Sequence, residues 1–283
     1  MKISIVVPIT RKWAIPHVIE NINRLECLGL DINVLLYIDS TDRELRDLVI
    51  KNVLRYSSDI AWSDNQPTME RKVSYRRNRI VEMKQHTAKL VNPCDYVFSF
   101  EDDTVVPPDA LKRLLALMSD NVGFAQGVQC GRWDLPMLGV WRVDNIDSPN
   151  EIHTVPLSTG VQEVDAGGFY CYLTPYDLYT GIPYRWHDEC FGPDVCYGLD
   201  VRATSLLVLT DFDLHCGHMT NHQTLYPNGS EKQLSWKLRN GDWIRQFSFL
   251  DLKKSLNVPL NDLSLITTKS ATLPQSGEWS EER

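Results

Sequence analysis

Residues 96–115 read YVFSFEDDTVVPPDALKRLL, and this stretch decides how the chain is interpreted. The apolar run YVFSF predicts a buried β-strand. The strand ends in three adjacent acids, Glu101, Asp102 and Asp103. Acids favour a helix N-terminus, and VPPDAL follows, but a helix needs only one of them. Three adjacent carboxylates are stable inside a protein only when a cation or a ligand's hydroxyl groups meet them, so the stretch predicts a binding site at the end of a strand.

The composition indicates a globular α/β protein with a large core. The chain has 283 residues, of which 43% are hydrophobic and 23% are charged. This length fits one large domain or two small ones. The formal net charge is -8, from 37 acidic and 29 basic residues. A general binder of nucleic-acid backbones would more often carry a basic face, so this class is disfavoured.

The N-terminus and the cysteines predict a cytoplasmic protein. The apolar stretch in MKISIVVPIT is too short for a signal peptide, and charged residues follow it directly. No run approaches the roughly 18 apolar residues that a transmembrane helix needs. The seven cysteines are odd in number and lack CxxC spacing, which is typical of reduced thiols.

Strand and helix patterns alternate through the first 130 residues. Near-continuous apolar runs predict strands buried on both faces, and 3.6-residue periodicity between them predicts helices. The predicted strands are ISIVVPI (3–9), INVLLYID (32–39), DYVFSFEDD (95–103) and VGFAQGVQCG (122–131), and the predicted helices lie within 16–30, 40–56, 74–90 and 106–118. This order indicates a mostly parallel sheet with helices on both faces.

Such a sheet binds ligands at the carboxyl ends of its strands. Asp39 ends the second predicted strand and the acids of 101–103 end a later one, so both groups are expected to line one crevice. Asp39 alone fits equally well as a cap of the next helix, together with Ser40 and Thr41.

The second half of the chain has a different character. Residues 131–163 predict hairpins in a small antiparallel excursion, and a strand, a helix and a late strand follow at 164–174, 192–206 and 206–218. Residues 230–256 predict one or two helices, and the polar end of the chain predicts disorder. We therefore expect a main domain at 1–225, divided near residue 130, a helical extension at 226–262 and a disordered tail at 263–283.

Seven segments in one order carry a family resemblance. They are IVVPIT, LLYIDSTD, RRNRI, FSFEDDTVVPPDALKRL, VDAGGFYCYLT, HDECFGPDVCYGLDVRA and DLHCGH. Over roughly residues 2–220 they resemble nucleotide-sugar glycosyltransferases of the GT-A fold, in particular the family 2 type. The resemblance implies a Rossmann-like, mostly parallel sheet, a sugar nucleotide as donor and a divalent cation, Mn²⁺ or Mg²⁺, as cofactor. It also implies a nucleotide-binding half at about 1–130 and an acceptor half at about 131–225.

The resemblance assigns the donor site. Glu101-Asp102-Asp103 matches the DxD motif, which implies that Asp103 binds the metal and Glu101 the ribose, with Asp102 able to replace either. A hard cation that neutralises a leaving diphosphate prefers such oxygen ligands. The remaining donor residues implied by the family are Pro8 and Thr10 around the base, Asp39 on the base, Arg77 and Asn78 along the nucleotide, and Gly167 and Gly168 where the backbone approaches the sugar or diphosphate.

The catalytic base implied by the resemblance is Asp194. In the family pattern a Glu precedes this Asp, whereas here Pro193 does. This departure leaves open a different acceptor, or a shift in register that makes Glu189 or Asp188 the base. Asp194 also fits a helix N-cap.

The late histidines and three tryptophans complete the predicted site. In relatives a His after the late strand completes the metal or diphosphate site, and His215 has this position, with His218 as the weaker candidate. Trp133, Trp141 and Trp186 are candidate platforms for the acceptor sugar, although a single Trp is more often a core residue.

The predicted function is transfer of a sugar from a nucleotide diphosphate sugar to a hydroxyl group, with inversion and with Asp194 as general base. UDP-sugar is favoured over GDP-sugar. The acceptor is expected to be a carbohydrate, a lipid-linked or a small molecule, with a modified nucleic acid base as a further option. The alternatives are a retaining transferase of the same fold and a degenerate protein that only binds sugar nucleotides.

Overall fold

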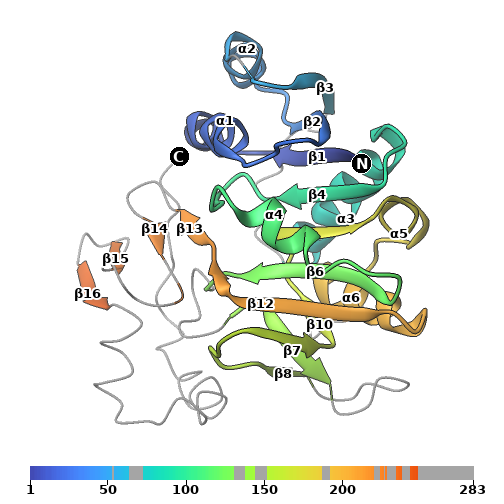
Figure 1. Cartoon of the computed structure of the whole chain (residues 1–283). Coiled ribbons are helices and arrows are strands. Elements are labelled where there is room, and N and C mark those ends of the chain that lie inside the picture. The colour runs from blue at the N-terminus through green and yellow to red at the C-terminus, as the bar shows by residue number, and fades with distance from the viewer. Residues whose placement is uncertain are drawn as a thin grey trace.

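The computed structural model describes residues 1–52, 54–63, 73–130, 138–143, 152–186, 192–219, 224–225, 227, 234–237 and 243–247. Its centre is an eight-stranded sheet with the order β3-β2-β1-β4-β11-β6-β12-β9 (Figure 1). The strands of this sheet are β1 (Lys2–Ile9), β2 (Asp31–Asp39), β3 (Ser57–Ser63), β4 (Tyr96–Phe100), β6 (Val122–Val128), β9 (Val161–Val164), β11 (Cys171–Pro175) and β12 (Leu207–His215).

The four strands β3, β2, β1 and β4 are parallel to one another, and β12 is parallel to β6. The strand β11 runs antiparallel between β4 and β6, and β9 runs antiparallel along the edge of β12. Most of the described sheet therefore has the predicted parallel arrangement. The carboxyl ends of β1, β2 and β4 lie at the same end of the sheet, because these strands share one direction.

Helices cover both faces of the sheet, as the alternating pattern predicts. One hydrophobic cluster contains residues of α1, α2 and α4, and the other packs against α3, α5 and α6. The helices are α1 (Ile15–Arg24), α2 (Arg43–Lys51), α3 (Val73–Leu90), α4 (Ala110–Leu115), α5 (Tyr176–Gly181) and α6 (Pro193–Ala203), and a 3-10 turn, η1, spans Lys12–Ala14. None of the described helices is long and apolar enough to cross a membrane.

Two small three-stranded sheets lie beside the main one. The first joins β5 (Thr104–Val105) to β13 (Gly217–Met219) and β14 (Thr224–Leu225). The second has the order β10-β7-β8 and is antiparallel. Its strands are β7 (Val140–Val143), β8 (Ile152–Thr154) and β10 (Ala166–Gly167). The second sheet is the antiparallel excursion that the sequence predicts.

Three predictions of secondary structure need correction. The edge strand β3 was not predicted, because SSDIAWS is largely polar and exposed. The segment 164–174, predicted as one strand, contributes to β9, β10 and β11. The helices predicted at 230–256 are wrong where the structure describes that segment, since β15 (Leu234–Lys237) and β16 (Trp243–Phe247) pair as antiparallel strands there. These segments are rich in Trp, Phe and Ile, which favour strands. The tail at 263–283 lies outside the described residues.

Candidate active site

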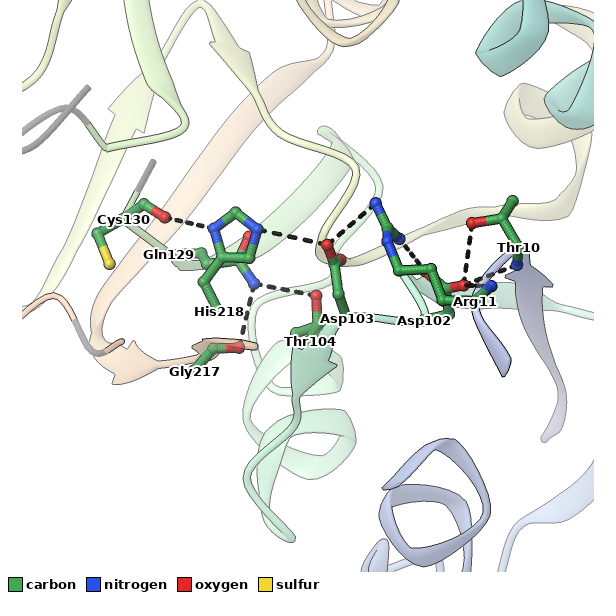
Figure 2. Close-up of polar contacts among 9 residues, drawn as sticks. All are labelled: Thr10, Arg11, Asp102, Asp103, Thr104, Gln129, Cys130, Gly217 and His218. Atoms are coloured by element: carbon green, nitrogen blue, oxygen red, sulfur yellow. Dashed lines mark hydrogen bonds and ion pairs between the residues drawn. The ribbon is translucent and has the colours of Figure 1, made fainter. Parts of the chain in front are cut away.

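The acid tripeptide lies where the main sheet meets the first small sheet. Glu101, Asp102 and Asp103 follow β4 directly and precede β5. Asp102 faces the end of β1, where its Oδ2 atom accepts hydrogen bonds from the backbone N–H groups of Thr10 (2.7 Å) and Arg11 (2.8 Å) and from the Thr10 hydroxyl (3.1 Å). Asp102 therefore holds the loop after β1 in place (Figure 2).

The side chain of Arg11 provides a positive charge to two of the acids. Its guanidinium forms an ion pair with the Oδ1 atom of Asp102, and its Nη2 atom lies 3.2 Å from the Oδ2 atom of Asp103. Both carboxylates are buried, whereas 34% of the Arg11 side chain is exposed. Part of the positive charge that the three acids require therefore comes from the chain itself, through Arg11.

His218 lies on the other side of Asp103 (Figure 2). Its Nδ1 atom is 2.8 Å from the carbonyl oxygen of Cys130, which can only accept, so Nδ1 carries a proton. The Nε2 atom lies 3.4 Å from the Oδ2 atom of Asp103. Pairing of β13 with β5 places His218 opposite Thr104, next to the acids. In neutral His218 the lone pair of Nε2 is therefore turned towards Asp103.

His215, the stronger sequence candidate, makes a different contact. It ends β12, and its Nε2 atom lies 2.8 Å from the carbonyl oxygen of Phe212. The structure thus brings His218, rather than His215, to the acid cluster.

The residues around Asp103 can hold a divalent cation that takes further ligands from solvent or phosphate. A histidine that binds metal typically donates its other N–H to a backbone carbonyl, as His218 does to Cys130. Mg²⁺ typically binds through one or two protein groups plus waters and phosphates. Among the residues that the structure describes, no group of three or more His, Cys, Asp or Glu side chains forms a complete metal cage. The donor set therefore fits a cation shared with a phosphate ligand.

A pocket of about 170 Å³ opens beside this cluster. It brings together residues from both halves of the chain, and its polar lining includes the side chains of three candidates, Glu101, Asp194 and His218. Trp141, Phe169 and Tyr170 contribute aromatic lining. The volume is below the roughly 300 Å³ of a pocket for a drug-sized ligand, so it suits one part of a larger ligand, such as a sugar ring.

The acids of the pocket have raised pKa values. Burial, followed by the charge of Asp103, raises the pKa of Glu101 to about 7, although Arg11, Lys84 and His218 act in the opposite direction. Burial also raises the pKa of Asp194, against the effects of hydrogen bonds from the backbone and of the charges on Arg77 and Lys84. Raised pKa values of this kind are frequent at functional sites.

Asp194 lies in the first turn of α6, after the N-cap residue Gly192 and after Pro193. Its Oδ1 atom accepts the backbone N–H of Val195 at 3.0 Å. The structure therefore places Asp194 inside the helix rather than at the N-cap, with its carboxyl group at the pocket. Asp188 and Glu189, the alternative bases, lie outside the described residues.

Asp39 is engaged by the protein itself. Its carboxylate accepts hydrogen bonds from the Ser63 hydroxyl and from Arg79, and Arg79 also donates to the Asp39 carbonyl. The N-cap of α2 is Asp42, whose Oδ1 atom accepts the N–H of Glu44 at 2.9 Å. Asp39 is thus no helix cap, and it is fully buried at the end of β2.

Arg77 and Asn78 contact the segment after α5. The indole Nε1 of Trp186 donates to Oδ1 of Asn78 at 2.7 Å, and the Arg77 guanidinium lies 5.6 Å from the centre of the Trp186 ring. These contacts hold α3 to the segment before α6. The charge of Arg77 also lowers the pKa of Asp194, which connects Arg77 to the predicted base rather than to Asp39.

The two glycines are required by packing inside the protein. A Cβ atom on Gly167 would lie 2.2 Å from the Gln126 side chain, and one on Gly168 would lie 2.2 Å from the Tyr170 ring. Gly168 also lines the pocket.

The remaining residues predicted from the sequence differ in where the structure places them. Pro8 is buried in β1, and Thr10 contacts Asp102. Trp141 lies in β7 and lines the pocket, while Trp133 lies outside the described residues.

Sequence reasoning missed the contributions of Arg11 and Lys84. Nothing in PITRKW shows that Arg11 returns to the acids 91 residues later. Lys84 had a usable signal, because it follows Ile80 by four residues and precedes Ala88 by four, on a face of α3 that packs against the core.

Comparisons with known proteins support the fold. No protein-family model matches the chain, and no curated protein matches it. The solved structure of S. aureus TarS, residues 1–349, is similar with a TM-score of 0.51 and 10% identity, over 75% of this chain and 58% of that one. The chain therefore has a GT-A type fold, and it spans less than two thirds of that protein.

Two further solved structures are similar at lower scores. The Pyrobaculum calidifontis mannosyltransferase PcManGT, in complex with GDP-Man and Mn²⁺, has a TM-score of 0.48 and 12% identity over 76% of this chain and 55% of that one. Glucosyl-3-phosphoglycerate synthase from Mycobacterium tuberculosis, in complex with Mg²⁺ and UDP, has a TM-score of 0.47 and 13% identity over 87% of each chain.

Proposed function

We propose that this protein is a glycosyltransferase that transfers a sugar from a nucleotide diphosphate sugar to an acceptor hydroxyl. The observation that carries the proposal is the pocket lined by Glu101, Asp194 and His218, next to the buried carboxylate of Asp103, on a sheet of the GT-A type. An acidic site and a candidate base converge there, at the end of a sheet where α/β proteins bind ligands.

Asp194 is the proposed general base. In the reaction, the acceptor O–H gives its proton to the Asp194 carboxylate while the oxygen bonds to the sugar's anomeric carbon. The bond from that carbon to the diphosphate breaks, and its electrons leave with the diphosphate. Attack from the side opposite the leaving group inverts the anomeric configuration. A base must be ionised at working pH and must reach the proton, and the position of Asp194 at the pocket supports the second condition.

Asp103 and His218 are the residues proposed to hold a divalent cation, Mn²⁺ or Mg²⁺. This assignment replaces His215, whose ring nitrogen faces Phe212. When bound, the cation supplies positive charge for the departing diphosphate. Arg11 adds a second positive charge at the same acids, and His218 is held in place by Cys130.

The donor is proposed to lie along the ends of β1 and β4. Glu101 is then the ribose contact, and Pro8 and Thr10 belong to the loop near the base. Arg79 and Ser63 already donate hydrogen bonds to the Asp39 carboxylate. The proposed role of Asp39 is therefore to support the nucleobase site from below. UDP-sugar remains favoured over GDP-sugar.

The acceptor half is proposed to begin near residue 131 and to use the aromatic part of the pocket. Aromatic faces pack well against the C–H faces of sugars, and Trp141 and Phe169 line the pocket. A carbohydrate, a lipid-linked or a small molecule, or a modified nucleic acid base, can present the hydroxyl group.

A thermal-shift screen tests donor binding directly. UDP and GDP, each with and without Mn²⁺, are added to the wild type, Asp103→Asn and the control Asp31→Asn, whose acid is exposed at the start of β2. Selective binding raises the melting temperature by mass action. We expect one nucleotide to stabilise the wild type and the control only with Mn²⁺, and Asp103→Asn not to respond. No response to any nucleotide would contradict the proposal.

A protein that only binds sugar nucleotides is the second candidate, because Pro193 replaces the acid that precedes the base in the family pattern and Arg11 already pairs with the acids. Slow hydrolysis of the UDP-sugar by the wild type, but not by Asp194→Asn, would exclude this candidate. The anomeric configuration of the product separates inversion from retention.

A further inference from the structure

Lys84 is a buried ammonium group close to the proposed active site. It lies in α3, and the residue is only 2% exposed. Its Nζ atom donates hydrogen bonds to the hydroxyl of Ser99 in β4 (3.2 Å) and to the hydroxyl of Tyr172 in β11 (3.1 Å). The same atom lies 4.6 Å from the centre of the Phe169 ring and 4.9 Å from that of Tyr172. Neutral groups and aromatic faces therefore surround the charge.

This burial is unfavourable for stability. An ammonium group inside a protein loses its hydration, which is unfavourable unless an opposite charge compensates for the loss. Among the ion pairs between described residues, none joins Lys84 to a carboxylate within 4.0 Å. Burial lowers the pKa of Lys84 to about 8, and the charges of Glu101 and Asp194 limit that decrease. Lys84 therefore stays protonated at neutral pH.

The two acids that act on Lys84 are the two carboxyl groups of the pocket. Ser99 lies in β4, two residues before Glu101, which directly follows the strand. Phe169 lines the pocket and also lies over Lys84. The buried cation thus lies between Ser99 of β4 and the Phe169 ring, which lines the same pocket as Asp194.

From this geometry we propose that Lys84 is a positioning residue whose buried positive charge, behind the Phe169 ring that lines the pocket, favours the carboxylate form of Asp194. The proposal rests on the proposed function for its catalytic meaning. Lys84 is too deeply buried to bind a ligand itself, because the hydroxyl groups and the Phe169 ring cover its Nζ atom.

Other titratable groups near Lys84 do not supply the same charge. The tyrosines of the hydrophobic cluster on this side of the sheet stay neutral, because burial raises their pKa values far above the neutral range. They are Tyr172 in β11, Tyr179 in α5, Tyr184 in the segment after α5, and Tyr197 in α6. Arg77, on the same helix, is the other cation whose charge favours the ionised form of Asp194. Lys84 is the cation that acts on both Glu101 and Asp194.

The test measures the ionisation of Asp194 directly, without any ligand. The ¹³C signal of the Asp194 carboxyl group, assigned by its loss in Asp194→Asn, is followed against pH in the wild type and in Lys84→Met. Loss of a nearby positive charge disfavours the carboxylate, so we expect the midpoint to rise by about one pH unit. An unchanged or lower midpoint overturns the proposal.

Three further variants keep the result unambiguous. Lys84→Gln is neutral but retains a donor for Ser99 and Tyr172, so it must show the same rise if Lys84→Met does not fold. Lys84→Arg retains the charge, and its midpoint is expected to stay near that of the wild type. Lys89→Met removes an exposed lysine of the same helix and controls for nonspecific effects. A rise of equal size in Lys89→Met overturns the proposal.

A kinetic measurement separates this proposal from the proposed function. For the donor that the thermal-shift screen identifies, the acidic limb of the pH profile of kcat/KM should move to higher pH in Lys84→Met, by the same amount as the Asp194 midpoint. If the midpoint moves and the kinetic profile does not, Lys84 controls the charge of Asp194, but Asp194 is not the base. That outcome contradicts the proposed function and leaves the inference about Lys84 intact.

Discussion

The ends of β2 and β4 differ sharply, although the sequence gives both the same appearance. Each is a buried parallel strand that ends in acid, Asp39 in one case and Glu101 to Asp103 in the other. Asp39 is enclosed by Arg79 and Ser63, with hydrogen bonds of 2.5 Å. Asp103 instead has looser contacts, 3.2 Å to Arg11 and 3.4 Å to His218, and lies next to a pocket.

This difference shows that an acid at the end of a strand becomes a structural pair or a binding site according to what the rest of the chain places against it. At β2, one guanidinium satisfies one carboxylate. At β4, the single guanidinium of Arg11 pairs with two of three adjacent acids, and the pKa of Glu101 stays raised despite the charges of Arg11, Lys84 and His218, so these groups compensate the negative charge only in part. The excess is what a divalent cation can neutralise.

The largest expected effect is on turnover at the end of β4. Asp103→Asn should lower kcat by roughly 10²–10³-fold, because it removes charge that stabilises the transition state through the bound cation. Its melting temperature should stay close to that of the wild type. Steady-state kinetics with the donor identified by thermal shift, together with a melting curve, measure both quantities. Unchanged turnover would place β4 in the same structural class as β2.

The corresponding substitution at the end of β2, Asp39→Asn, should mainly affect stability. Asp39→Asn leaves the Arg79 guanidinium without its counter-charge in a partly buried position, and we expect a loss of about 3 kcal/mol in the free energy of unfolding. Urea denaturation measures this loss. Below the unfolding transition, turnover should fall far less than in Asp103→Asn. A stable Asp39→Asn protein without activity would instead indicate direct contact between Asp39 and the donor.

A smaller effect separates the two histidines. His218→Ala should weaken binding of Mn²⁺ by about tenfold, or about 1.4 kcal/mol, because it removes one of the two proposed protein ligands. His215→Ala is the matched control, since it lies three residues away and contacts Phe212. Calorimetric titration with Mn²⁺ alone compares the two variants. Weaker binding in His215→Ala than in His218→Ala would restore the assignment made from the sequence.

The smallest effect concerns Arg11, whose guanidinium competes with a cation for Asp103. Arg11→Gln should bind Mn²⁺ about threefold more tightly, a change of about 0.6 kcal/mol. The backbone N–H of Arg11 still holds Asp102 in this variant, so the loop after β1 should keep its place. The same titration measures the affinity. Weaker binding would mean that Arg11 supports the metal site instead of competing with the metal.

The strands and helices of the first 130 residues were largely predictable, because each is encoded by a local pattern. The apolar runs gave β1, β2, β4 and β6, and the Ser-Thr-Asp sequence before α2 contains its cap, Asp42. Edge strand β3 was missed because its exposed positions need no apolar residues. In the second half, short strands exchange partners between sheets, and no local pattern encodes such pairing.

The candidate site was predictable only in part. The acid tripeptide and Asp194 stand out as residue types, and the structure brings Glu101 and Asp194 to one pocket. The choice between His215 and His218 was not predictable. It depends on the pairing of Thr104 with His218 across more than one hundred residues, and on the end of β12 at His215, after which His218 belongs to β13 in a different sheet.

The sequence by itself determined that buried strands would end in acids and that these acids required positive charge, because desolvation of a carboxylate is costly wherever it occurs. Only the tertiary structure decided which positive charge each acid receives. Arg79 pairs with Asp39, and Arg11 pairs with Asp102 and Asp103. His218 lies next to Asp103. Ion pairs depend on distances of a few ångströms between residues far apart in the chain, and the packing of helices and strands sets those distances.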